Sequence, residues 1–515
     1  MASCSRSLCS TEIESALLEE SSVSSFGSEF SDHESDIDYA QEEFTRLEHE
    51  DNDEEAVTLT SADSDIQWVW RELRTLYHGR KIPFSGQSGP QKHFDSVLDS
   101  FLLFFDEDII NTIVTETNRY AEQYIESCTL KPRSRVRNWE PVTGDEIYVV
   151  LGLLMLMGII QKPTLKSYFS RDAFLESPIF PQTMKQDQFE LIMKFIHFVD
   201  NTTADSYTGP SKLFKIHNFL EKINNKFQSA YLPSENIAVD ESLTLWKGRL
   251  GIKQYIPLKA AKFGIKTFEL CESTSGYLWN FIVYSGAGTE VTTETDVPDK
   301  LKSSKIVIKL CEPLLNKGYT LWMDNYYNSP SLCLLLKDKG VNVAGTLRHV
   351  PPIVKDKKLK KGEIVAAESN GIMVMKWKDK KDVSFITTFH DNSMSTKQVR
   401  FKQVTKPTCI TQYNHSMGGV DKKDQMIQPY LLERKRTKKW YIKLFRRLLN
   451  SDTSTTNSNS LRSWSPLCKS TTLKTNRQAF YREDTRNGEE SKTPEKMCSL
   501  YNTEEKKEGH NILVS

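Results

Sequence analysis

The stretch Met417-Gly418-Gly419-Val420-Asp421-Lys422-Lys423-Asp424-Gln425-Met426 is the most informative segment of the chain. Two glycines lead into a charged segment whose carboxylates, Asp421 and Asp424, stand three residues apart. On a helix this spacing places both carboxylates on one face. Taken alone, such a pair is more often a solvated helix face or a partner of the helix dipole. Its meaning therefore depends on whether other carboxylates meet it in the fold.

Two other aspartates stand at the ends of short apolar segments that are typical of strands. Asp240 follows the run Ile-Ala-Val, and Asp324 follows the run Leu-Trp-Met. A single aspartate at such a position is usually a turn or cap residue. Three separate segments of an α/β pattern can nevertheless bring carboxylates to one sheet edge, and two Mg²⁺ or Mn²⁺ ions need several such oxygen ligands. We therefore expect Asp240, Asp324 and Asp421 to converge on a metal site for phosphoryl transfer, with Asp424 beside them as a further ligand.

The charges of the 515-residue chain are unevenly distributed, although 68 basic and 68 acidic residues make it neutral on average. Residues 1–66 contain 19 acidic residues and only two basic ones, Arg6 and Arg46, which leaves 66 basic and 49 acidic residues for the remainder. A basic body attached to an acidic segment is typical of a protein that binds nucleic acid. The alternative is a lysine-rich surface that is merely solvated.

Hydrophobic periodicity separates an unstructured start from a helical region. Residues 1–93 are rich in Ser, Asp and Glu, and we expect most of them to be disordered. Over 94–235 the apolar residues recur at helical spacing. Within that region Asp106 is a candidate helix cap, and Thr143-Gly-Asp-Glu146 has the pattern of a capping box.

From residue 236 the apolar period changes to that of strands, and helical segments then alternate with them. The expected strands cover residues 236–246, 263–271, 277–284, 319–324 and 341–347. Helices are expected at about 300–317 and after the cap Ser329, where Pro330 takes the first turn. This order predicts an α/β sheet of the ribonuclease-H type. The predicted regions are a catalytic domain in two parts (236–349 and 412–450), a β insertion between them (350–411) and a polar low-complexity tail (451–515).

Basic runs within and after the predicted insertion are candidates for DNA binding. Trp377 and Trp440 stand near enough in sequence to offer stacking to bases. Solvated charge is the alternative for both runs, and the second run also has the pattern of a nuclear-import signal. The candidate residues are Lys355, Lys357, Lys358, Lys360, Lys361, Arg434, Lys435, Arg436, Lys438 and Lys439.

Several other classes of protein find no support in the sequence. Nine scattered cysteines include no Cys-x-x-Cys pair, which argues against a disulfide framework and a zinc ribbon and suits a reducing compartment. The start of the chain lacks a basic-then-apolar signal, and the longest apolar run, 147–160, is too short to span a bilayer. Neither a P-loop nor a His-Glu-x-x-His motif is present. We expect a soluble intracellular protein with no membrane partner.

Five motifs, in the same order along the chain, resemble those of the piggyBac transposase family. They are Val239-Asp-Glu-Ser-Leu-Thr-Leu-Trp-Lys-Gly248, Lys253-Gln-Tyr-Ile-Pro-Leu-Lys259, Lys262-Phe-Gly-Ile-Lys266, Met323-Asp-Asn-Tyr-Tyr-Asn-Ser-Pro330 and Gly418-Gly-Val-Asp-Lys-Lys-Asp-Gln-Met426. The resemblance runs from about residue 94 to 449. It points to the branch of domesticated, piggyBac-derived transposases of animals.

The resemblance implies a ribonuclease-H-like, cut-and-paste DNA transposase that works through a DNA hairpin and inserts at TTAA. It assigns the catalytic aspartates to Asp240, Asp324 and Asp421, and the fourth acidic residue to Asp424. By the same resemblance, 94–235 is a helical dimerisation and DNA-binding region, and 350–411 is an insertion domain. The implied setting is a nuclear homodimer on double-stranded DNA, with Mg²⁺ or Mn²⁺ as cofactor.

The chain departs from the family pattern after Asn450. Family members continue there with apolar helices and commonly end in a Cys/His-rich zinc module, whereas this sequence becomes rich in Ser, Thr and Asn. Only Cys498 and His510 remain in that stretch, which is too few for a zinc site, so no zinc is expected. Two hypotheses follow. One is an active transposase or a domesticated descendant, and the other is a nuclear DNA-binding or interaction protein that keeps the fold without productive transposition.

Overall fold

The structure is a computed structural model that describes residues 66–455, apart from 94–95, 258, 260, 287–288, 290, 298–300, 400–401 and 433–436. Residues 1–65 of the region predicted to be disordered (1–93), residues 456–515 of the predicted tail (451–515), and the candidate DNA-binding residues Arg434, Lys435 and Arg436 lie outside the described residues.

Helices occupy the first half of the described chain. Two predicted N-caps are confirmed: the Asp106 side chain accepts from the backbone N–H of Ile109, and Thr143 and Glu146 form a reciprocal capping box. Each cap satisfies donors that the first helical turn leaves unpaired. The α-helices are α3 (Val97–Phe104), α4 (Glu107–Ser127), α5 (Gly144–Ile159), α6 (Leu165–Tyr168), α7 (Ile179–Thr183), α8 (Gln186–Phe195) and α9 (His217–Ala230).

The apolar run at 147–160 forms most of α5, whose residues are largely buried. A helix that is apolar around most of its circumference needs protein on all sides, and this explains why its hydrophobicity is not confined to one stripe. Among the described residues, none of the helices combines the length and the apolar character needed to cross a bilayer.

A mixed sheet forms the centre of the second half, in the order β1-β10-β11-β12-β9-β8-β4-β6-β5, with β7 also paired to β6. The pairs β4–β8 and β8–β9 are parallel, and the other pairs are antiparallel. The five strands that were predicted from the sequence are present, with bounds close to the predicted ones. They are β4 (Asn236–Leu245), β6 (Phe263–Glu272), β7 (Leu278–Val283), β8 (Thr320–Met323) and β9 (Asn342–Thr346). The remaining strands are β1 (Arg71–Glu72), β5 (Lys253–Tyr255), β10 (Ile364–Ser369), β11 (Ile372–Lys378) and β12 (Asp382–Thr387).

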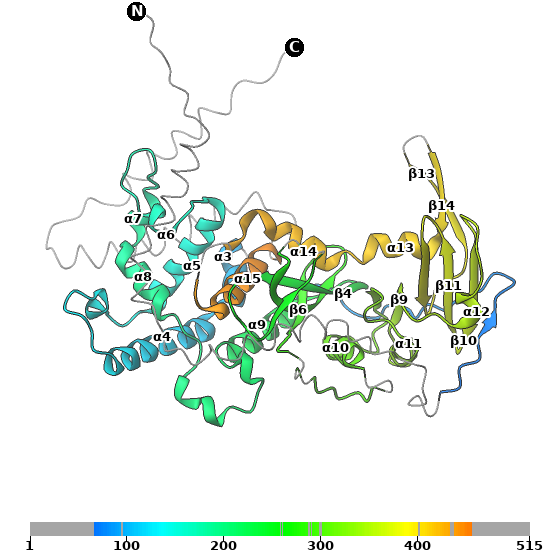
Figure 1. Cartoon of the computed structure of the whole chain (residues 1–515), viewed down its shortest axis with the longest axis horizontal. Helices are drawn as coiled ribbons and strands as arrows, with labels where there is room; N and C mark the ends of the chain where they lie inside the picture. The colour runs from blue at the N-terminus through cyan, green and yellow to red at the C-terminus, as the bar shows by residue number, and fades with distance from the viewer. Residues whose placement is uncertain are drawn as a thin grey trace, which may run out of the picture. The chain divides into compact units, whose positions relative to one another are not determined.

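Helices cover both faces of this sheet. On one face, α10 (Lys302–Cys311) and α11 (Pro330–Asp338) bury their apolar residues against β4, β6 and β8. The cap predicted at Ser329 is confirmed, because its side chain accepts from the Leu332 N–H. On the other face lie α13 (Thr408–Ser416), α14 (Gly419–Ile427) and α15 (Trp440–Thr455). Figure 1 shows α13 and α14 on one side of the sheet and α10 and α11 on the other.

The predicted β insertion contributes most of its strands to the main sheet. Strand β12 pairs with β9, so β10, β11 and β12 extend the sheet outward from β9, after the short helix α12 (Pro352–Lys355). Within the described residues only β13 (Met394–Val399) and β14 (Lys402–Pro407) form a ribbon apart from it, and β2 (Gly89–Pro90) pairs with β3 (Tyr231–Leu232) elsewhere. Helix α15 continues to Thr455, past the boundary predicted at residue 450.

Candidate active site

Asp240 and Asp324 occupy matching positions on two adjacent parallel strands. The register of β4 and β8 pairs Val239 with Met323, and each aspartate is the next residue along its strand. Val239 and Met323 both lie in the apolar core under α10 and α11. Because successive side chains of a strand point to opposite faces, the two aspartates belong to the other face, which α13 and α14 cover.

Helix α14 brings its two carboxylates to the same face as Asp240. Asp424 accepts from the hydroxyl of Ser242, two residues beyond Asp240 on β4, at 3.0 and 2.9 Å. Two residues of a strand span about 6.6 Å, and three residues of a helix rise about 4.5 Å. These lengths are similar enough for Asp421 to lie near Asp240 when Asp424 lies at Ser242.

Lys259 connects the strand and the helix through one ammonium group. Its Nζ lies 3.8 Å from Oδ2 of Asp240 and 3.7 Å from Oδ1 of Asp421. The two carboxylate oxygens can therefore be no further apart than the sum of these distances. The side chains of Lys259 and Asp240 are largely buried, whereas 60% of the Asp421 side chain is exposed. Lys259 belongs to one of the sequence motifs, but its role in the cluster was not predicted.

The electrostatics of the cluster indicate a deficit of positive charge. Burial raises the pKa of Asp240 to about 7, and although Lys259 opposes this shift, Glu241 and Asp324 add to it. Burial also raises the pKa of Asp324, even though its carboxylate accepts from the Tyr326 N–H at 3.0 Å. Carboxylates crowd together at such a cost where a function needs them.

Tyr413 of α13 interacts electrostatically with all three carboxylates. Burial chiefly, and to a smaller extent the charges of Asp324, Asp240 and Asp421, raise the pKa of its hydroxyl to about 12, against the lowering effect of a hydrogen bond with Thr346. A single hydroxyl that senses three carboxylates lies close to all of them, because Coulomb interactions weaken with distance. The structure thus brings together the three aspartates that the sequence predicts to be catalytic.

Asp424 has a different environment from the other three aspartates. Burial alone would raise its pKa, but Lys423 and Arg447 lower it to about 2, helped by the Ser242 hydroxyl. Lys423 Nζ lies 3.0 Å from Oδ1 of Asp424, and Arg447 donates to the same oxygen. Asp424 is therefore a paired carboxylate rather than one in need of a cation.

A buried ion pair lies beneath Asp424. The side chain of Lys423 is fully buried and donates to Glu269 of β6, which also accepts from the Thr267 hydroxyl at 2.9 Å. Burial would lower the pKa of Lys423, yet Asp424 and Glu269 raise it above its ordinary value. Lys423, Glu269 and Arg447 were not predicted as site residues, because their partners lie in distant segments.

The donor chemistry of Asp240, Asp324 and Asp421 fits a divalent cation, whereas their present spacing is wider than a bound ion requires. Mg²⁺ and Mn²⁺ prefer carboxylate oxygens, and the pKa values of Asp240 and Asp324 are raised chiefly by burial, with neighbouring carboxylates adding to the shift. Across the described residues, no group of three or more His, Cys, Asp or Glu side chains is gathered closely enough to hold a metal ion. To bind an ion, the three carboxylates would therefore have to move closer together, and the Lys259 ammonium would have to move away from its position between Asp240 and Asp421.

The first basic run follows α12, on the β10–β12 side of the sheet. Part of its charge is neutralised, because Lys357 lies 3.0 Å from Glu72. The buried Lys376 ammonium donates to the carbonyls of Lys355 and Lys357 at 2.6 and 2.5 Å, which fixes the start of the run. Lys358, Lys360 and Lys361 are exposed.

The described part of the second basic run packs against the helical region. Lys439 donates to the carbonyl of Lys194 and lies 4.9 Å from the ring centroid of Tyr120, whereas Lys438 is exposed. Lys439 thus holds the start of α15 to the helical region.

The two tryptophans predicted to stack on bases both pack within the protein. Trp377 of β11 is 5% exposed and belongs to an apolar core that includes Phe385 and Met375. Trp440 is half-buried and packs edge-on against Tyr441, with ring centroids 5.9 Å apart. For Trp377 the prediction is wrong, because alternation along β11 turns its ring into the core rather than toward solvent.

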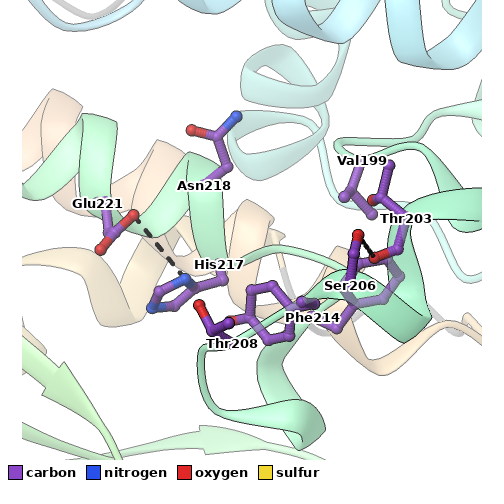
Figure 2. Close-up of a pocket in the computed structure, with 9 residues that line it drawn as sticks. Val199, Thr203, Ser206, Thr208, Phe214, His217, Asn218 and Glu221 are labelled. Atoms are coloured by element: carbon purple, nitrogen blue, oxygen red, sulfur yellow. Dashed lines mark hydrogen bonds and ion pairs between the residues drawn. The ribbon is translucent and has the colours of Figure 1, made fainter.

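The helical region contains a separate pocket of about 390 Å³ between residues 199 and 221. Figure 2 shows aromatic and polar side chains around it, including His217, whose Nδ1 lies 3.8 Å from Glu221. None of the four aspartates lines this pocket. It is therefore distinct from the carboxylate cluster.

Comparisons with known proteins identify the family. The family model described as transposase IS4 matches residues 97–459. Human PiggyBac transposable element-derived protein 2 is 30% identical over 365 residues, and human PiggyBac transposable element-derived protein 3 is 27% identical over 359 residues. Each alignment covers 66% of this chain and 57% of the relative, so the chain spans little more than half the length of these curated relatives.

A solved structure has the same fold. The cryo-EM structure of the piggyBac transposase synaptic complex with hairpin DNA matches with a TM-score of 0.64 and 22% identity, covering 79% of this chain and 89% of that one. At this identity the likeness concerns the mixed α/β fold. Together with the family model and the human relatives, it supports one conclusion: the chain belongs to the piggyBac branch of the IS4 transposase family.

Proposed function

We propose that this protein cleaves and transfers DNA strands by two-metal phosphoryl transfer, as a piggyBac-like cut-and-paste transposase or a domesticated descendant of one. The observation that carries the proposal is the meeting of Asp240, Asp324 and Asp421 on one face of the sheet, from segments far apart in the chain. The family assignment makes a DNA substrate the natural choice for such a cluster. The ribonuclease-H-type catalytic domain is part of the same proposal.

Asp240, Asp324 and Asp421 are the residues we expect to hold Mg²⁺ or Mn²⁺. When bound, such ions activate the attacking oxygen and stabilise the leaving oxygen of an in-line displacement at phosphorus. The chain contributes the three carboxylates and determines whether they are protonated. Asp240, with a pKa raised to about 7, must give up its proton to act as a ligand. Until then, the Lys259 ammonium neutralises part of the negative charge of these carboxylates. It also lies close enough to the site to attract the negative charge of a phosphate.

The proposed partner is double-stranded DNA, with transposon ends and TTAA targets as its specific forms. The basic remainder of the chain provides the attraction. Within the part of the chain that the structure describes, Lys358, Lys360 and Lys361 of the first run form no ion pair, in contrast to Lys357. A homodimer and a nuclear location complete the proposal and follow from the family alone.

A plasmid assay tests the proposal directly. Purified full-length protein is incubated with supercoiled plasmid and Mn²⁺ or Mg²⁺, and nicked circles are quantified with and without EDTA. We expect metal-dependent nicking that Asp240→Asn, Asp324→Asn and Asp421→Asn each abolish. Nicking that survives all three substitutions would place the chemistry elsewhere or in a contaminant.

A second candidate function is a nuclear DNA-binding or interaction protein that has the fold without productive transposition. The observation that favours it is the Lys259 ammonium between Asp240 and Asp421, where a metal would otherwise balance the charge. Mn²⁺ titration separates the two candidates. Wild-type protein that binds DNA but neither binds Mn²⁺ nor nicks plasmid supports the second.

A further inference from the structure

Asp424 lies at the centre of a buried set of charges that joins α14 to β4 and α15. Its Oδ1 atom accepts from the Ser242 hydroxyl at 3.0 Å, lies 3.0 Å from Lys423 Nζ, and accepts from Arg447 Nη2. The Oδ2 atom accepts from the same hydroxyl at 2.9 Å. Arg447 also donates to the Ser242 oxygen at 3.0 Å. Both carboxylate oxygens are thus engaged with the protein.

The same set reaches β6 through Lys423. Its buried ammonium donates to Glu269, so the group contains two cations and two carboxylates and is electrically balanced. Only 8% of the Arg447 side chain and 27% of the Asp424 side chain are exposed. Charges so little exposed are stable only while each keeps its partner. Asp424 could therefore serve as a metal ligand only by leaving the Arg447 guanidinium and by leaving Lys423 with Glu269 alone.

Backbone packing shows that α14 is seated closely at this point. Gly276, in the turn between β6 and β7, has a φ of +76°, and a Cβ there would approach the Lys423 backbone nitrogen to 3.0 Å. Glycine tolerates both this φ and the close approach. The helix is consequently held from three directions, by the turn, by the Glu269–Lys423 pair and by Arg447.

We propose that Asp424 and Arg447 are a positioning pair that fixes α14 so that Asp421 faces Asp240, and that Asp424 is not itself a metal ligand. The inference rests on the proposed metal site for its purpose, but its geometry is independent of any metal. Asp421 stands one helical turn from the pair and is largely exposed. The position of the Asp421 side chain therefore depends on how rigidly α14 is packed against the sheet.

The charge balance predicts how substitutions of the pair will combine. Arg447→Met leaves one surplus negative charge in the buried set, and Asp424→Asn leaves one surplus positive charge. The double variant Asp424→Asn/Arg447→Met is balanced again. We therefore expect the double variant to bind metal at least as tightly as Arg447→Met and to unfold at the same or a higher temperature. The effects of the two substitutions would then be non-additive, as expected for residues that act as a unit.

Two measurements on the full chain test the inference. The first is Mn²⁺ affinity by isothermal titration, where we expect Arg447→Met and Asp424→Asn each to weaken binding about tenfold or more, as outer residues that orient a ligand do. The second is hydrogen–deuterium exchange of the α14 amides, which should accelerate in both variants. Gln425→Met is the matched control, because it introduces the same methionine at an exposed position of the same helix and should change neither readout.

A ligand role for Asp424 gives the opposite pattern. Removing Arg447 would then free the carboxylate, so Arg447→Met would bind Mn²⁺ as tightly as the wild type or more tightly, with unchanged exchange in α14, and this result would overturn the inference. Should Arg447→Met not fold, Arg447→Lys and the double variant provide the same comparison. Wild-type protein that binds no Mn²⁺ would count against the proposed function, while the exchange measurement would still decide the positioning role.

Discussion

The ammonium nitrogen of Lys259 lies 3.8 Å from the carboxylate of Asp240, whose pKa is raised by the acidic neighbours Glu241 and Asp324 and lowered by this lysine. This pair controls the protonation of the site. Burial lowers the pKa of Lys259, but Asp240 and Asp421 raise it above its ordinary value, so the lysine stays charged at neutral pH. The neighbouring aspartate is therefore the group whose charge changes near neutrality.

Asp240→Asn should change the pH dependence of stability. Because the pKa of Asp240 is raised from 3.8 to about 7, the native state keeps a proton between these values that the unfolded state releases. Its contribution is complete below pH 3.8 and is lost as the pH rises through about 7. We expect the variant to gain about 1–3 kcal/mol over the wild type at alkaline pH and little in acid. Denaturant unfolding across this pH range measures the difference, and parallel curves for the two proteins would contradict it.

Lys259→Met should raise the pKa of Asp240 further, because the lysine lowers it in the wild type. Protons would then compete more strongly with cations, so the pH at which Mn²⁺ binding is half complete should move upward. Mn²⁺ titrations at a series of pH values measure this midpoint. Lys262→Met is the control, since that lysine is exposed in the same loop. A downward shift in Lys259→Met would mean that the ammonium excludes the metal more strongly than it repels the proton.

Replacing Lys358, Lys360 and Lys361 together with alanine should weaken binding to duplex DNA of any sequence. If these side chains neutralise phosphates, the slope of log affinity against log salt should fall by about 0.9 for each phosphate that the variant no longer neutralises. Fluorescence anisotropy over a salt series provides the slope. Lys357→Ala serves as the comparison, because that lysine is already paired with Glu72. An unchanged slope in the triple variant would remove this run from the DNA interface.

Deleting residues 1–66 should raise the affinity for non-specific DNA at low salt. That segment carries 19 of the 68 acidic residues but only Arg6 and Arg46 as basic ones, so its removal exposes DNA to a body with a net positive charge. The gain should disappear as salt rises, because screening weakens both attraction and repulsion. Equal affinities for the full-length and shortened proteins at low salt would show that the acidic segment does not compete with DNA.

Local signals made several parts of the fold predictable. The caps at Asp106, Thr143 and Ser329 depend on neighbouring residues only, and all three form as predicted. The alternation around Val239 and Met323 likewise fixes which face receives the two strand-end aspartates. Short-range hydrogen bonds and the two-residue period of a strand are properties that a sequence displays directly.

Long-range pairing was not predictable in the same way. Nothing local to Lys423 indicates that its ammonium will be buried against Glu269, 154 positions away. For Asp424, the sequence permits a solvated residue, a ligand or an ion-pair partner, and packing of α15 decides among them. The strands at 364–387 were expected in a separate insertion, but pairing of β12 with β9 adds them to the main sheet. Edge pairing of this kind depends on which strand of the folded sheet still has unpaired backbone groups along one edge.

The hydrogen bond from Arg447 to Ser242 joins residues 205 positions apart, and this separation orders the assembly of the site in time. At a synthesis rate of about 5–20 residues per second, roughly 10–40 s pass between the emergence of one partner and that of the other. During most of that interval β4 already carries Asp240, while α13, α14 and α15 have not yet been made. A half-made protein would thus lack the complete carboxylate cluster, and it would present an uncovered sheet face to chaperones until α15 is made.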